Sequence, residues 1–93
     1  MSQSSQHHAT FTIQNELGLH ARPAMLLVQS VSRLTCEVYI EKDGLEADAK
    51  SIMGVLTLAA EQGSRITVRA EGPDAEKAIH AIGKLVEEKF GED

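Results

Sequence analysis

The chain has 93 residues, of which 42% are hydrophobic and 25% are charged, and its formal net charge is −5 at pH 7. This length predicts one domain with one modest hydrophobic core, and the acidic balance without a basic block argues against direct binding of nucleic acid. The sequence has one cysteine, Cys36, no secretory signal and no apolar run long enough to span a bilayer, which favours a cytoplasmic protein without membrane insertion.

The first third of the chain predicts a tail, a strand and a helix. Residues 1–8 show no periodicity and are expected to form a mobile N-terminal tail, which leaves residues 9–93 as a single domain. Apolar and polar residues then alternate over 9–15, as they do in a half-buried strand. From Ala21 the apolar residues recur at spacings of four and three, which predicts a helix that ends near Leu34.

The middle of the chain predicts a hairpin and a second helix. Asp43-Gly44 is a strong hairpin-turn signal and divides residues 36–50 into two short strands. Ser51 is a good N-terminal cap for the helix that follows, and Gly63 suits its C-terminal exit.

The last third predicts a fourth strand over residues 65–71 and a third helix capped by Asp74. The expected buried stripe of this helix consists of Ala78, Ile79, Ile82, Leu85, Val86 and Phe90. The terminal EEKFGED is typical of a fraying, charged helix end. The predicted order is βαββαβα, and apolar and polar residues alternate along the strands. This pattern predicts a two-layer α+β sandwich in which helices cover one face of the sheet and the other face is exposed to solvent.

The segment LGLHARPA, Leu17–Ala24, places a histidine where the first helix is expected to begin. Pro23 is tolerated in a first helical turn, so His20 is expected at or next to the N-cap, beside amides that have no partner within the helix. Such a terminus carries partial positive charge and binds anions, and Arg22 has a guanidinium suited to phosphate oxygens. Gly18 permits the sharp turn that exposes the imidazole.

On spacing alone, two interpretations of His20 stay open. The nearby cation and the helix terminus disfavour imidazolium, so the ring is expected to be nucleophilic, and the same groups could hold a phosphoryl group. The other interpretation is that His20 only caps a helix beside a surface arginine. The sequence contains no glycine-rich nucleotide-binding motif and no metal-ligand cluster, so no cofactor or metal is expected, and a phosphoryl group would come from another protein.

Two motifs, GLHARPA and, from Lys50, KSIMGVLTLAAEQGSRITV, resemble the HPr family, the histidine-containing phosphocarrier proteins of the bacterial phosphoenolpyruvate-dependent phosphotransferase system. The resemblance extends from about Ala9 to the end of the third helix. It implies an open-faced sandwich in which three helices cover a four-stranded antiparallel sheet. It also implies that His20 accepts a phosphoryl group from phosphorylated enzyme I and passes it to sugar-specific IIA proteins, with Arg22 stabilising the phosphate. Some relatives carry another residue in place of the histidine and are regulatory only, whereas this chain keeps it.

The serine of the second motif has two roles that do not exclude each other. As an N-cap, Ser51 stabilises its helix by about 1 kcal/mol. The resemblance implies that an HPr kinase/phosphorylase also phosphorylates Ser51 as a regulatory step. A phosphate at a helix N-terminus meets favourable amides, so the fold should tolerate the added charge.

The apolar residues after Ser51 cannot all face inward on so short a helix. The side expected to be buried consists of Val55, Leu58 and Ala59. Ile52 is then intermediate and Met53 and Leu56 are exposed, which together with Met25 predicts a docking surface for partner proteins next to His20. The alternative is that these side chains pack loosely on the sheet.

Two other functions stay open. A regulatory, nitrogen-related phosphocarrier would use the same histidine to control targets other than sugar uptake, although KSIMG favours the sugar branch. A small histidine phosphatase would need an acid/base partner and a substrate pocket, and neither is recognisable in the sequence. The protein is expected to be a monomer that carries phosphoryl groups without independent turnover, in sugar transport and carbon catabolite regulation.

Overall fold

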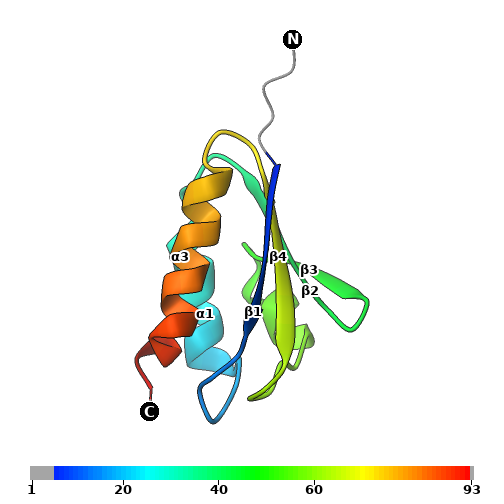
Figure 1. Ribbon diagram of the computed structural model, residues 1–93, viewed down its shortest axis with the longest axis vertical. Coiled ribbons are helices and arrows are strands. Elements are labelled where there is room, and N and C mark those ends of the chain that lie inside the picture. Colours follow the sequence, from blue (N-terminus) through cyan, green and yellow to red (C-terminus); the bar gives the residue numbers. More distant parts are fainter. Residues whose placement is uncertain (1–5, 93) are drawn as a thin grey trace.

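The computed structural model describes residues 6–92 and consists of one four-stranded sheet and a layer of helices (Figure 1). The strands are β1 (Gln6–Thr12), β2 (Glu37–Lys42), β3 (Leu45–Asp48) and β4 (Arg65–Glu71). The helices are α1 (Ala21–Val31), α2 (Ile52–Thr57) and α3 (Ala75–Glu87), followed by the 3-10 helix η1 (Lys89–Gly91).

The sheet has the order β1-β4-β2-β3, and every neighbouring pair of strands is antiparallel. Figure 1 shows α1 and α3 lying side by side along one face of this sheet, and α2 packs against α1 and β3. The predicted two-layer α+β sandwich with the order βαββαβα is therefore confirmed. Among residues 6–92, no helix has both the length and the apolar character that a membrane crossing requires.

The core lies between the sheet and the helices. Alternate strand residues point into it, as the sequence pattern predicted, and the largest of them are Val38, Ile40, Ile66 and Val68. The helices contribute Ala24, Leu27, Val28, Val31, Ala75, Ala78, Ile82 and Val86. Ile79 and Leu85 of the predicted stripe are only partly buried, at the edge of this layer.

The hairpin between β2 and β3 forms at the predicted turn. Asp43 and Gly44 both adopt left-handed backbone conformations, with φ of 51° and 84°. Two consecutive positive φ angles are typical of a type I′ turn, which matches the twist of the flanking strands. The local sequence therefore determines this connection.

The predicted N-terminal tail, residues 1–8, includes three residues that belong to the first strand. Residues 6–8 belong to β1 and pair with residues 69–71 of β4. Because β4 offers backbone partners along its whole length, the ladder continues beyond the point where side chains give any strand signal. Residues 1–5 lie outside the described residues.

The second helix is shorter than predicted. It ends at Thr57, and Ala59 (φ 50°) takes the left-handed conformation that the sequence assigned to Gly63. The reason is tertiary, because Ala60 is buried and its carbonyl oxygen accepts a hydrogen bond of 2.8 Å from the amide of Leu19. This bond ties the end of α2 to the segment that carries the candidate site.

Two other helix ends also differ from the prediction. The first helix ends at Val31 rather than near Leu34, whose amide donates to the carbonyl oxygen of Val31 in a closing turn. Asp74 does precede α3, but its carboxylate accepts a hydrogen bond of 2.7 Å from the amide of Thr35 instead of capping the helix. That contact links the start of α3 to the loop before β2.

Candidate functional site

His20 is the N-cap residue of α1, as the position of Pro23 predicted. Its backbone is extended (φ −83°, ψ −168°), and its carbonyl oxygen accepts the first helical hydrogen bond from the amide of Ala24 at 2.9 Å. The ring itself makes no capping bond, and 37% of the side chain is exposed. The imidazole can therefore meet a partner while the first amides of α1 stay free of helical partners.

The turn before His20 depends on Gly18. Its φ is +70°, and its amide donates to the carbonyl oxygen of Asn15 at 3.1 Å. A Cβ atom on Gly18 would clash with the carbonyl oxygen of Ala60. Glycine is thus required here for its backbone conformation and for the close packing against the end of α2.

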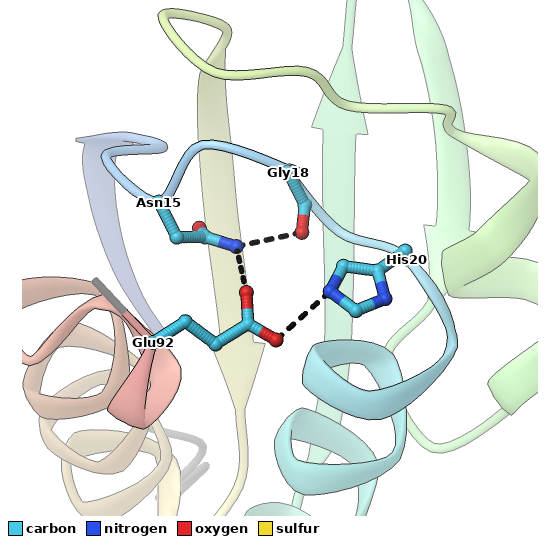
Figure 2. A network of polar contacts seen from close by, with 4 residues as sticks. All are labelled: Asn15, Gly18, His20 and Glu92. Atoms are coloured by element: carbon cyan, nitrogen blue, oxygen red, sulfur yellow. Dashed lines mark hydrogen bonds and ion pairs between the residues drawn. The ribbon is translucent and has the colours of Figure 1, made fainter.

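A carboxylate that the sequence analysis missed faces the ring (Figure 2). Oε2 of Glu92 lies 2.9 Å from Nε2 of His20, across a sequence separation of 72 residues. Oε1 of Glu92 accepts a hydrogen bond of 3.0 Å from Nδ2 of Asn15, and the same Nδ2 donates to the carbonyl oxygen of Gly18 at 2.8 Å. No motif or periodicity in the sequence indicates these contacts.

The predicted fraying of the C-terminal segment is wrong for the described residues. Lys89 and Phe90 adopt left-handed conformations (φ 56° and 54°), and Gly91 follows with φ 77°. These three residues reverse the chain after α3 and return it to His20. Left-handed backbone is unfavourable for Lys89 and Phe90, by about 1–2 kcal/mol each. The Phe90 side chain, only 1% exposed, offsets this strain by its burial.

The contacts of Glu92 also lower its pKa below the ordinary value of a glutamate. The largest cause is the hydrogen bond from Asn15. Desolvation raises the pKa, but the hydrogen bond and charge of His20 and the charge of Arg22 lower it further. Glu92 is therefore ionised at neutral pH. The sequence indicated two positive influences on His20, Arg22 and the helix terminus. The structure adds this negative group, which favours a hydrogen on Nε2.

The orientation of the ring leaves its second nitrogen free for chemistry. Nε2 is directed at Glu92, and Figure 2 shows the other ring nitrogen, Nδ1, pointing away from that carboxylate. Arg22 is exposed in the first turn of α1 and has no ion pair within residues 6–92. Its guanidinium can therefore turn toward an anion at the start of the helix.

Ser51 caps α2 as predicted, since its Oγ accepts a hydrogen bond of 3.1 Å from the amide of Gly54. Packing explains why a glycine follows in this helix. A Cβ atom on Gly54 would lie 3.3 Å from the carbonyl oxygen of Asp48 in β3. Ser51 is partly buried, and the two residues after it, Ile52 and Met53, are exposed.

The exposure of the predicted docking residues agrees only in part with the expectation. Met53 is exposed as predicted (73%), and Met25 is 42% exposed. Ile52, expected to be intermediate, is 40% exposed, whereas Leu56, expected to be exposed, is partly buried because α2 packs against α1 and β3. We call Met25, Ile52 and Met53 the apolar patch. Leu17, which the sequence analysis did not single out, is 70% exposed three residues before His20.

The buried side of α2 also differs by one residue from the prediction. Val55 and Leu58 are buried, but Ala60 takes the place expected for Ala59. The early end of the helix explains the change, because the chain turns at Ala59 and directs the next side chain inward.

Residues 7–88 match the family model described as the PTS HPr component phosphorylation site. The chain belongs to the HPr family. The phosphocarrier protein HPr of Xylella fastidiosa (strain Temecula1) is 46% identical over 82 residues, which cover 88% of this chain and 92% of that protein. The HPr-like protein Crh of Halalkalibacterium halodurans is also 46% identical, over 77 residues that cover 83% and 92%.

The fold agrees with solved HPr structures. The crystal structure of HPr-C-His from Thermoanaerobacter tengcongensis superposes with a TM-score of 0.90 at 46% identity, and the match covers 94% of this chain and 98% of that chain. The similarity in sequence and the similarity in fold therefore point to the same family. Glu92 lies outside the region that the family model matches.

Proposed function

We propose that this HPr-family protein accepts a phosphoryl group on His20 from phosphorylated enzyme I and passes it to sugar-specific IIA proteins. The observation that carries the proposal is the partly exposed imidazole at the N-terminus of α1, beside helix amides without helical partners and the exposed Arg22 side chain. Phosphoryl transfer depends mainly on positioning and charge stabilisation, and these groups supply both.

Within His20, the acceptor atom is Nδ1. Because Nε2 faces Glu92 at 2.9 Å, Nδ1 is the nitrogen that a donor's phosphorus can approach. The phosphoryl oxygens would then be near the first amides of α1 and within reach of the flexible Arg22 side chain. A surface groove lies between β1 and α3, and none of these site residues lines it. The site therefore suits binding of a partner protein's surface better than binding of a small substrate in a pocket.

Incubation with active enzyme I and phosphoenolpyruvate, followed by intact mass measurement, tests the proposal. One acid-labile phosphoryl group per chain is expected, and it should be absent in His20→Ala. His80→Ala, which removes an exposed histidine on α3, is the matched control and should be phosphorylated normally. An unmodified wild-type chain, or a modified His20→Ala chain, would contradict the assignment.

The apolar patch supports a docking role for the surface around α1 and α2. The patch, formed by Met25, Ile52 and Met53, exposes large apolar side chains on two helices that pack against each other, and α1 begins at His20. A phosphate on Ser51 would lie next to Ile52 and Met53. We therefore propose regulatory phosphorylation of Ser51 by an HPr kinase/phosphorylase, with weaker partner binding as its consequence.

A regulatory phosphocarrier is the second candidate function. It is favoured by the similarity to Crh of Bacillus subtilis, which is 40% identical and whose solved structure is described as a catabolite repression HPr. Such a protein would use His20 to control targets other than sugar uptake. Transfer from the phosphorylated chain to a panel of sugar-specific IIA proteins distinguishes the two candidates, because a regulatory protein would accept the group from enzyme I and donate it to none of them. In either case we propose a cytoplasmic monomer, and sedimentation of the phosphorylated and unphosphorylated forms would reveal a dimer.

A further inference from the structure

We propose that Asn15 is a positioning residue for phosphoryl transfer. It holds the Glu92 carboxylate on Nε2 of His20, so that the ring presents Nδ1 to phosphorus and keeps its hydrogen on Nε2 while the group is carried. This inference rests on the proposed function of His20.

The environment of Asn15 is unusual for a polar side chain. The residue is fully buried, and within the described chain its Oδ1 atom has no hydrogen-bond partner. Burying an amide with an unpaired oxygen is unfavourable, and an apolar side chain would avoid that penalty. The compensation lies on the nitrogen, which donates to Gly18 at 2.8 Å and to Glu92 at 3.0 Å.

The direction of the amide is fixed by these two partners. If the amide were flipped, Oδ1 would lie where Nδ2 lies, against the carbonyl oxygen of Gly18 and the carboxylate oxygen of Glu92. Both contacts would then join two acceptors, which repel each other. Asn15 therefore acts as a double donor that connects the turn before His20 to the C-terminal segment.

The carboxylate held by Asn15 determines which ring nitrogen carries hydrogen. Oε1 of Glu92 is occupied by Asn15, and Oε2 faces Nε2 of His20 at 2.9 Å (Figure 2). A carboxylate in this position keeps the hydrogen on the facing nitrogen and stabilises the ring when it becomes positively charged. The depressed pKa of Glu92 is consistent with this geometry, because its hydrogen bonds are made to the ionised form.

This arrangement matters when the phosphoryl group moves. The Nδ1 lone pair forms the new N–P bond, and the bond from phosphorus to the donor breaks with its electron pair left on the donor. Because Nε2 keeps its hydrogen, the phosphorylated ring is positively charged. The Glu92 carboxylate stabilises this positive charge, whereas the Arg22 guanidinium destabilises it. In transfer onward, a nucleophile of the acceptor protein forms a bond to phosphorus while the N–P bond breaks. The electron pair of the N–P bond returns to Nδ1, and the ring leaves as neutral imidazole with its hydrogen on Nε2.

Without Asn15, the carboxylate is no longer held against the ring. The phosphorylated ring then gives up its Nε2 hydrogen to water at a lower pH, and a ring without that hydrogen is a poorer leaving group. The expected signature is a change in the pH dependence of phosphohistidine loss, with little change at acidic pH, where the ring is protonated in any variant.

The test uses chemical phosphorylation of the full chain by phosphoramidate, so that no partner protein is needed. The rate of phosphohistidine loss is followed by intact mass from about pH 5 to about pH 9, the range in which histidine chemistry titrates. The rate of loss is expected to decrease as the pH rises. In Asn15→Ala and in Glu92→Gln, the midpoint of this decrease should lie at a lower pH than in the wild type. At mildly alkaline pH both variants should lose the group about tenfold more slowly than the wild type, the effect of one charge partner on a titrating group.

A double-mutant cycle separates positioning from general damage to the fold. If Asn15 acts through Glu92, the variant with both Asn15→Ala and Glu92→Gln should have the profile of Glu92→Gln alone. Glu88→Gln, which removes an equal charge from an exposed position in the same segment, should keep the wild-type profile. A wild-type profile for Asn15→Ala, or additive effects in the double variant, would overturn the proposal.

Two further measurements keep the outcome decisive. If Asn15→Ala fails to fold, Asn15→Ser replaces it, since serine is too short to reach Glu92. In the unphosphorylated wild type, nitrogen NMR of the neutral ring should place the hydrogen on Nε2, and a hydrogen on Nδ1 would refute the proposal by itself. Failure of enzyme I to phosphorylate the chain would instead count against the proposed function, because neither measurement depends on enzyme I.

Discussion

Replacing Gly18 with alanine tests how the turn before His20 is built. At φ +70°, an L-residue is strained by about 1–2 kcal/mol. In addition, the new Cβ would clash with the carbonyl oxygen of Ala60, which is backbone and cannot rotate away. Forcing an atom into a packed site costs about 1–3 kcal/mol. The free energy of unfolding should therefore fall by about 2–5 kcal/mol, the sum of these two effects.

Gly63→Ala is the matched control for this substitution. Gly63 has a similar φ of +88°, but no atom lies within 4 Å of the position that its Cβ would occupy. Only the conformational strain applies, so the expected loss is about 1–2 kcal/mol. The comparison therefore isolates the contact between the Gly18 turn and Ala60.

Urea unfolding of the wild type and the two variants provides the measurement. Both midpoints should fall with unchanged slopes, and the Gly18→Ala midpoint should fall further. At a temperature where Gly18→Ala stays folded, phosphoryl transfer through His20 should also slow, because the displaced turn carries Asn15 and His20. Equal destabilisation by the two substitutions would refute the close-packing argument.

The remaining predictions concern single side chains of the site. His20→Ala should abolish acid-labile phosphorylation by enzyme I, while the free energy of unfolding measured in urea changes by about 1 kcal/mol or less. Retained phosphorylation would mean that another residue is the acceptor. Arg22→Glu should strongly slow transfer with near-normal thermal melting, and unchanged kinetics would show that the helix amides suffice. Ser51→Asp keeps an N-cap but sets a charge beside the apolar patch, so the KM for enzyme I should rise more than kcat falls. Because the folded-state pKa of Glu92 is lowered, its ionised form stabilises the fold above its ordinary pKa and this contribution is lost as pH falls through the folded value. The stability difference between wild type and Glu92→Gln should therefore shrink in acid, and a difference that persists in acid would contradict the assignment.

The sequence by itself determined the features that depend on a few adjacent residues. Pro23 marks the first turn of α1 and so places His20 at the helix start, and Ser51 caps α2 because its side chain reaches an amide three residues on. The Asp43-Gly44 turn has the same local origin. Each of these depends on backbone preferences and short-range hydrogen bonds that are encoded within one turn of chain.

Only the tertiary structure decided which distant groups meet. The end of α2 at Thr57 depends on a hydrogen bond between Ala60 and Leu19, which overrides the helical pattern that continues in the sequence. The carboxylate at His20 comes from Glu92, 72 residues later, and reaches the ring because burial of Phe90 directs the chain end back over the site. Local propensity carries no information about such contacts, since their energy comes from packing between segments that are adjacent only in the folded protein.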